Sequence, residues 1–227
     1  MKKQVAIISL FALSLVSMQA YAAGPISPLA HSKPVLQTTV LGSQKMSLEK
    51  RYGNKPVNDV MKDNILLTLY YLSGKVKKPA DINWDTITTK PFQYDLVLAP
   101  GEAFAFHEDA LPEFSEKVVA TTHATFGPED GFKSDGYLYG DGVCHFASLI
   151  NWAAQDAGLS VTARVNHNFA KIPEIDAKYG TSIYYAPGNH ATSQAQNLYV
   201  VNNRANPVHI VFTVKNNVLD VTISEEK

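Results

Sequence analysis

The stretch "NLYVVNNRANPVHIVFTVKNNVLDVTIS", from Asn197 to Ser224, decides the fold class of this chain. It holds three segments rich in β-branched and aromatic residues, which favour strands, and asparagine turns separate them. Upstream, "SVTARVNHNF" at 160–169 alternates like another strand. One helix is predicted from its cap at Asn58 to Gly74, and another over 142–157. We therefore expect an α+β fold, with one or two helices packed on a mainly antiparallel β-sheet formed mainly by the C-terminal half.

The second predicted helix opens with "GDGVCHFASL", residues 140–149, which contain the only cysteine of the chain. We expect Asp141 to cap this helix and Gly158 to end it. Cys144 then lies in the first turn, where unpaired N–H groups and the helix dipole favour a thiolate. The negative charge of Asp141 acts in the opposite direction and raises the thiol pKa. This position is typical of a catalytic cysteine at a helix N-terminus, and the alternative is a small core residue buried against apolar neighbours.

The first residues have the layout of a secretory signal peptide, which we assign to residues 1–22. Lys2 and Lys3 form a basic start, an apolar run follows at 5–18, and "AYA" at 20–22 marks the cleavage site. The apolar run is too short for a membrane span, which needs about 20 residues. We therefore expect a bacterial protein that is periplasmic or secreted, with no transmembrane segment after removal of the signal.

The remainder is predicted to hold a lead-in segment at 23–56, with one strand near "VLQTTVLG" at 35–42, and one domain at 57–227. The chain has 20 basic and 21 acidic residues, so it offers no basic excess that would bind nucleic acid. A single cysteine cannot form an internal disulfide, so its function becomes the central question.

Three histidines are placed to meet Cys144 in the folded chain. His145 is its neighbour, His167 lies on the predicted strand at 160–169, and His190 lies on the turn "GNHATS". A nucleophilic cysteine needs a base within hydrogen-bonding reach and a third group that orients the base. Tyr185 is a candidate wall of a peptide groove, and a place in the core is its alternative.

The order of motifs over about residues 57–225 resembles a VanW domain. The specific part is "GDGVC" at 140–144 opening a helix, followed downstream by "ARVNH" at 163–167. Support comes from "PGEAFAF" at 100–106 and "YYAPGNHAT" at 184–192. VanW domains are known as accessory proteins in glycopeptide-resistance clusters, and members have been described as cysteine-dependent L,D-transpeptidases of peptidoglycan. The resemblance implies a cell-envelope enzyme acting on peptidoglycan stem peptides, and we expect neither a cofactor nor a metal.

The resemblance also implies roles for the matching residues. Cys144 would attack the carbonyl before a terminal D-Ala, with His167 as the general base, and an amine of another stem would resolve the thioester. Arg164 would meet a stem-peptide carboxylate. On a regular strand Arg164 and His167 face opposite sides, so both reach one site only if the strand bulges or ends between them. The backbone N–H groups from Val143 to His145 would stabilise the oxyanion.

Two positions depart from the family pattern. His145 stands where the family usually has Gln after the cysteine. The sequence "GNHAT" at 188–192 stands where Gly-x-Asp-Ala-Thr is common. If that Asp orients the base, either His190 or Asn189 takes its place, and His190 is also a candidate for the base itself. The chain is therefore expected to be a divergent member.

Three other functions fit the same residues. With water as the acceptor, Cys144 and His167 would form a cysteine amidase, endopeptidase or carboxypeptidase of the cell wall. Cys144 and the three histidines would alternatively form a Cys/His metal-binding module, although their spacing is not that of a compact motif. In a non-catalytic envelope binding protein, Cys144 would be structural only.

Overall fold

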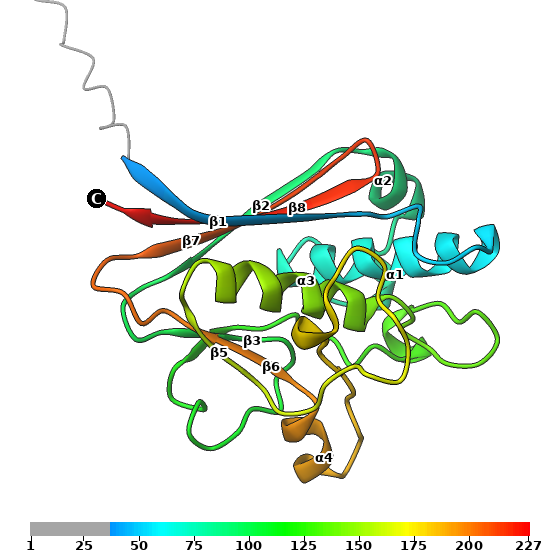
Figure 1. Ribbon diagram of the computed structural model, residues 1–227. Helices are drawn as coiled ribbons and strands as arrows, with labels where there is room; N and C mark the ends of the chain where they lie inside the picture. The colour runs from blue at the N-terminus through cyan, green and yellow to red at the C-terminus, as the bar shows by residue number, and fades with distance from the viewer. Residues whose placement is uncertain (1–36) are drawn as a thin grey trace, which may run out of the picture. The chain divides into compact units, whose positions relative to one another are not determined.

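Two four-stranded β-sheets enclose two long helices in the computed structural model, which describes residues 37–227 (Figure 1). The predicted signal peptide at 1–22 and the lead-in residues up to 36 lie outside the described residues. The α+β class is confirmed, whereas the expectation of a single sheet is wrong. The chain forms a second sheet from shorter strands, and the alternation of apolar and polar residues in the sequence predicts only some of them.

The first sheet has the strand order β1-β8-β7-β2, and every neighbouring pair in it is antiparallel. The turn between β7 and β8 consists of Asn216 and Asn217, which both have positive φ, as expected for a tight hairpin. The strand expected near 35–42 is β1, which lies beside the C-terminal strand β8 and belongs to this main sheet. The strands are β1 (Thr38–Ser47), β2 (Phe92–Leu98), β7 (Val208–Lys215) and β8 (Val218–Glu226).

The second sheet has the order β4-β3-β6-β5, with a parallel pair between β3 and β4 and antiparallel pairs elsewhere. The three C-terminal strands are all present as predicted, but β6 belongs to this sheet while β7 and β8 belong to the first. Between them the buried side chain of Asn202 donates to the carbonyls of Leu98 and Asn206, at 2.8 and 2.9 Å. The strands are β3 (Ala103–Ala105), β4 (Val118–Ala120), β5 (Ser160–Ala163) and β6 (Leu198–Val201).

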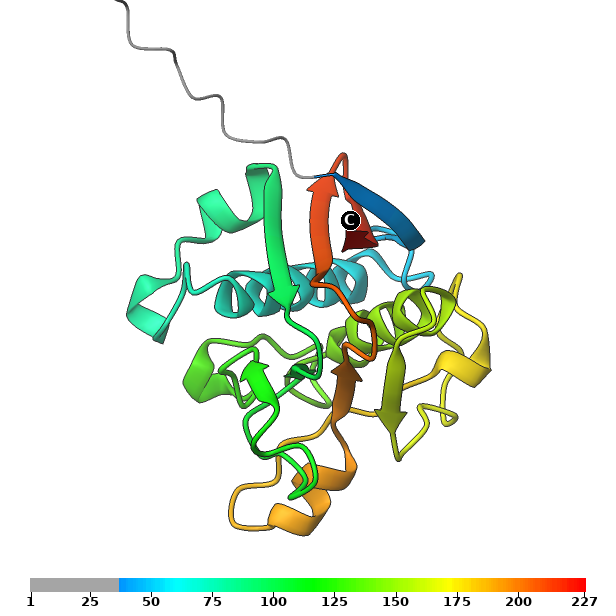
Figure 2. The same cartoon turned by 90° about the vertical axis from the view of Figure 1, so that its left-hand side faces the viewer.

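Helices α1 (Lys55–Leu72) and α3 (Val143–Asp156) lie between the two sheets, as the turned view shows (Figure 2). Helix α3 contacts β1 and β8 on one side and β5 and β6 on the other. Its apolar stripe, including Phe146, Ile150 and Ala153, is completely buried. The hydrophobic core therefore runs through both sheets, and α3 is its central element.

The N-cap of α1 differs from the prediction. Asn54 caps the helix, and Asn58 lies inside it with a buried side chain. The side-chain oxygen of Asn58 accepts hydrogen bonds from the backbone N–H groups of Arg51 and Tyr52, at 3.2 and 2.6 Å. Asn58 thus stabilises the turn before the helix. The helix stops before Gly74, which has a φ of 68° as expected of a C-terminal glycine.

Shorter elements complete the described residues. Residues 76–95, expected to form a loop or hairpin, instead contain a 3₁₀ helix, a short α-helix and the start of β2. Within residues 37–227, no helix combines the length and the apolar character that a membrane span requires. The short helices are η1 (Pro79–Asp81), α2 (Trp84–Thr89), η2 (Pro128–Asp130), η3 (Ala177–Tyr179) and α4 (His190–Ala195).

Candidate active site

Helix α3 places Cys144 in its first turn, as the sequence predicts, but the cap is Gly142 and not Asp141. The backbone at Gly142 is left-handed, with a φ of 94°. A Cβ atom at Gly142 would lie 2.7 Å from the carbonyl oxygen of Met61 in α1. Only glycine permits both this conformation and this close approach, which explains the residue before Val-Cys in the motif. The helix ends at Gly158 as predicted, again with positive φ.

Asn64 of α1 fixes the loop that leads into the cysteine helix. Its side chain is fully buried and donates to the carbonyl oxygens of Lys133 and Asp141, both at 3.0 Å. The Asn64 amide oxygen accepts from the backbone N–H of Lys133 at 2.8 Å. Both ends of the 133–141 loop are therefore tied to α1, and the position of Cys144 depends on these bonds.

A cavity of about 510 Å³ opens beside Cys144. Its walls come from the loop before α1, the loop and first turn of α3, the loop after β5 and the segment before α4. Five of the residues predicted for the site line this cavity: Val143, Cys144, His145, His167 and Tyr185.

The sulfur of Cys144 contacts the backbone of Ile183 on the opposite wall. The Ile183 N–H donates to Sγ at 3.3 Å, and Sγ lies 3.6 Å from the Ile183 carbonyl oxygen. Burial raises the pKa of the Cys144 thiol to about 11, the Ile183 N–H acts against this rise, and the charge of Asp141 adds to it. The expectation that the helix start favours a thiolate is therefore wrong for this resting state, because burial of the sulfur outweighs the dipole.

His167 lies in a loop and not on a strand, because β5 ends at Ala163. Its Nδ1 lies 3.2 Å from the carbonyl oxygen of Ala170, which only accepts hydrogen bonds, so Nδ1 carries the proton. Nε2 is consequently the basic nitrogen. Burial lowers the pKa of His167, which keeps the imidazole neutral and able to accept a proton at neutral pH. The ring packs against Phe169, with 3.9 Å between the centroids.

His145 lines the cavity, but its side chain is almost completely buried. Its ring lies edge-on to His167, with centroids 5.8 Å apart, and its Nε2 is 3.4 Å from the hydroxyl of Tyr52. Its Nδ1 has no partner among the described residues. Burial, with smaller contributions from the nearby Arg51 and His167, lowers the pKa of His145 to about 3. His145 is therefore a neutral residue that packs behind His167.

The amides at the start of α3 divide into two groups. The N–H of Val143 donates to the carbonyl oxygen of Gly140 at 3.1 Å, so it is not free for an oxyanion as the resemblance implied. For the N–H groups of Cys144 and His145, no backbone acceptor is found within residues 37–227. These two donors remain for a developing negative charge at this position.

Three residues predicted for the site do not line the cavity. Arg164 follows the end of β5 and forms an ion pair with Glu113, at 2.5 Å. His190 begins the short helix α4, is exposed, and bonds through Nδ1 to Asp109 at 2.9 Å. Asn189 is the cap of α4 and accepts from a backbone N–H of that helix. Although β5 ends at Ala163, Arg164 and His167 do not reach one site, because Arg164 pairs with Glu113 while His167 lines the cavity.

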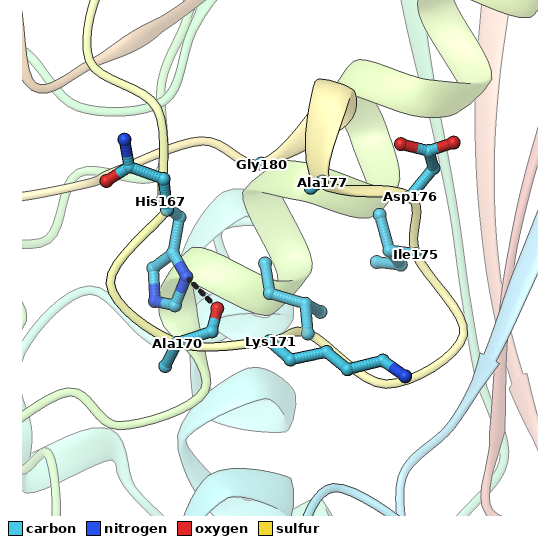
Figure 3. A pocket seen from close by; sticks show the side chains of 9 residues that line it. His167, Ala170, Lys171, Ile175, Asp176, Ala177 and Gly180 are labelled. Carbon is cyan, nitrogen blue, oxygen red and sulfur yellow. Dashed lines mark hydrogen bonds between the residues drawn. The ribbon is translucent and has the colours of Figure 1, made fainter.

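A second cavity, of about 410 Å³, shares His167 and Ala170 with the first. His167 forms one side of it, and the side chains of Lys171 and Asp176 form the other (Figure 3). The imidazole of His167 is therefore part of the walls of two neighbouring cavities. A base at such a position can serve two reactants that enter from different directions.

Sequence reasoning missed the residues that support the site. Asn64 carried a signal, because a polar residue within the apolar stripe of a helix is buried and needs partners. Ile183 carried none, since it acts through its backbone groups. Among residues 37–227, no three His, Cys, Asp or Glu side chains come together as metal ligands. The four-residue Cys/His module considered above is not assembled, because His190 lies outside the cavity.

The comparisons with known proteins define the class. The profile of the family described as "VanW like protein" matches residues 93–224, more than half of the chain. The chain belongs to the VanW-like family. The match covers Cys144 and His167, and it begins after α1. Neither a curated protein nor a solved structure matched the chain.

Proposed function

We propose that this protein is an exported cell-envelope enzyme that carries out cysteine-dependent acyl transfer on peptidoglycan stem peptides. One observation carries the proposal: Cys144 and a neutral His167 line the same cavity, and the amides of Cys144 and His145 there have no backbone acceptor within residues 37–227. These are a nucleophile, a base and an oxyanion site, which acyl transfer requires. Membership of the VanW-like family supports the assignment to the cell envelope.

The protonation states favour a general-base mechanism. Because the pKa of Cys144 is about 11, the sulfur is a thiol at neutral pH. His167 Nε2 takes the thiol proton as sulfur bonds to the carbonyl carbon before the terminal D-Ala. The amides of Cys144 and His145 receive the oxyanion. The C–N bond then breaks, the D-Ala amine leaves with the proton from His167, and a thioester remains on Cys144.

Substrate binding has to change the contacts of the sulfur. Within residues 37–227 no hydrogen bond joins Cys144 to a histidine, and Sγ is engaged by Ile183. Catalytic hydrogen bonds are often long or missing before substrate binds, and they tighten in the complex. When the stem peptide enters the cavity, its reactive carbonyl group would displace Sγ of Cys144 from Ile183, and Sγ would then face His167.

The second cavity favours transfer over hydrolysis. After D-Ala leaves, an acceptor amine must approach the thioester and lose a proton to His167. We infer that the acceptor binds in the cavity lined by Lys171 and Asp176, which shares His167 with the cavity of Cys144. A cysteine amidase or carboxypeptidase would need only water at this point, so the products of the reaction distinguish the two activities.

The decisive experiment is intact-protein mass spectrometry of the mature protein with disaccharide-tetrapeptide, beside the Cys144→Ala variant. The expected result is an acyl adduct on the wild type with release of D-Ala, and neither with Cys144→Ala. Dimeric products would identify transfer, and tripeptide products would identify hydrolysis. Absence of adduct and of D-Ala release in folded wild type would contradict the proposal.

Export is tested separately. If residues 1–22 are a signal peptide, the protein from the envelope fraction begins at Ala23. N-terminal sequencing of protein expressed in a bacterial host decides this. A chain that retains Met1 and stays in the cytoplasmic fraction would contradict export.

A further inference from the structure

Exposed aromatic side chains gather at the mouth of the Cys144 cavity. Tyr52, Tyr139, Phe169 and Tyr184 all line it, and between 41% and 73% of each residue is exposed. They come from four separate loops, so the fold and not one local motif brings them together. Within residues 37–227, the other large aromatic residue with comparable exposure is Tyr137, on the same loop as Tyr139. We call these five residues the aromatic rim.

The loop that carries Tyr137 is held in an ordered turn. Ser134 and Tyr139 form an antiparallel bridge, and the Gly140 N–H donates to the Lys133 carbonyl oxygen at 3.3 Å. The Tyr137 N–H donates to the side chain of Asp135 at 3.1 Å. Tyr137 is nevertheless 91% exposed. A fixed turn that presents a large ring to solvent leaves apolar area uncovered, which is the usual mark of a binding surface.

The charge around the cavity limits what can bind there. No lysine or arginine of the described residues lines it, whereas Glu129 and Asp141 do. Anionic lipid surfaces and polyanions are bound by clusters of basic residues, so they do not match this surface. An uncharged, flat ligand that meets ring faces and accepts hydrogen bonds from tyrosine hydroxyls matches it.

We propose that the aromatic rim binds the glycan strand to which the stem peptide is attached. The C–H groups on the face of a pyranose ring carry partial positive charge and pack on the negative face of an aromatic ring. Four of the five rim residues are tyrosines, whose hydroxyls can bond the hydroxyl and acetamido groups of the sugar. The inference rests on the proposed function, since the sugar lies at the rim while its peptide reaches down to Cys144.

The test measures binding without turnover. Cys144→Ala protein is titrated with the β-1,4-linked N-acetylglucosamine hexamer by calorimetry. We expect binding, weakened about tenfold by Tyr139→Ala and about tenfold by Tyr184→Ala, as loss of one stacked ring implies. Tyr184→Phe keeps the ring and should retain most of the affinity. Val119→Ala, an exposed residue outside the cavity, is the matched control and should leave binding unchanged.

Three results would overturn the inference. The first is that the hexamer does not bind, and the second is that the rim variants bind it as tightly as the Cys144→Ala protein. The third is that the protein binds phosphatidylethanolamine–phosphatidylglycerol vesicles instead and that the rim variants no longer bind them. The outcome is separate from that for the enzyme. An acyl adduct with free tetrapeptide but no hexamer binding would reject the rim and leave the enzyme. Hexamer binding by folded protein that never forms an adduct would support the rim and reject the enzyme.

Discussion

At the scale of single residues, the sulfur of Cys144 is under two opposing effects. The start of α3 offers unpaired amides and a positive dipole end, which stabilise a thiolate. Burial against the opposite wall and the carboxylate of Asp141 favour the thiol, and together they raise the pKa to about 11. Burial therefore wins in the resting protein. A thiol in this state needs a base to become a nucleophile, which is the role proposed for His167.

The thiol pKa predicts slow alkylation at neutral pH. At pH 8 the folded protein should react with iodoacetamide about 100-fold more slowly than the urea-unfolded chain, because far less thiolate is present. The rate should keep rising with pH up to about 11, the pKa of the group. Intact mass measured against time at each pH gives this profile. A rate that levels off below pH 8 would show a thiolate already formed at neutral pH.

The two candidate bases make a matched pair of variants. His167→Ala should lower the rate of acyl-adduct formation by about 10²- to 10⁴-fold, the usual contribution of a general base. His190→Ala should change that rate little, because His190 is exposed, pairs with Asp109 and does not line the cavity. Rates come from adduct mass against time, with circular dichroism as the control for folding. A larger loss in His190→Ala than in His167→Ala would reverse the assignment.

At the scale of elements, the contact between α1 and the start of α3 is the most constrained part of the site. Gly142 has positive φ and lies against the backbone of Met61. Asn64, one turn along α1, bonds to the loop just before. The cysteine helix therefore begins where it does because α1 leaves room only for glycine.

Gly142→Ala should destabilise the protein by about 3–5 kcal/mol. Positive φ costs a non-glycine residue about 1–2 kcal/mol, and the contact with Met61 forces a backbone shift of similar or larger cost. Gly74→Ala is the control, because Gly74 also has positive φ but nothing lies within 4 Å of its added Cβ. Urea unfolding of both variants measures the difference. Equal losses in the two would show that the approach of α1 is not limiting.

The helices and strands also show which features of the fold can be predicted from sequence patterns. The C-terminal strands and both long helices were predictable, because alternation and helical spacing are local signals. The sequence does not predict that β6 and β7 belong to different sheets, because this depends on how the chain crosses from one sheet to the other at Asn202. The alternation of "SVTARVNHNF" predicts a strand that includes His167, but the pairing with β6 stops at Ala163.

The sequence predicted that Cys144 and His167 belong to one site, but it did not predict where the other candidate residues lie. Cys144 and His167, which the motifs "GDGVC" and "ARVNH" predict for the site, line one cavity. The resemblance implies a place near them for Arg164, and the turn at 188–193 suggests one for His190, yet each is held by an acidic partner, Glu113 and Asp109. Such pairings between distant loops leave no local pattern that a sequence can reveal.

At the scale of the whole molecule, the functional unit is larger than the range that matches the family. The match begins at residue 93, after β1 and α1. Yet β1 lies in the main sheet, and α1 ties down the loop before Cys144 through Asn64. Both elements are therefore parts of the scaffold that positions the site.

Buried histidines give the whole molecule a dependence on pH. Burial lowers the pKa of His107, His145 and His167, in the case of His145 to about 3. The unfolded chain binds their protons near pH 6.5 and the folded chain does not, so stability falls as pH drops below 6.5. His209 differs: burial alone would lower its pKa, but Asp95 and Glu226 raise it. The contribution of His209 to stability is complete below pH 6.5 and is lost as pH rises through its folded pKa. His209 therefore does not change how stability depends on pH below 6.5.

His145→Gln isolates the largest of these effects, the lowered pKa of His145. Between pH 7 and pH 5, the wild type should lose about 2 kcal/mol more unfolding free energy than the variant, because only the wild type has this buried group to protonate on unfolding. Urea unfolding at each pH measures the two slopes, and the comparison does not depend on whether the variant is more or less stable overall. His190→Gln, which replaces an exposed histidine outside the cavity, is the control for the substitution itself. Identical slopes in wild type and His145→Gln would mean that His145 takes up its proton in the folded state, and that the wall behind His167 is open to water.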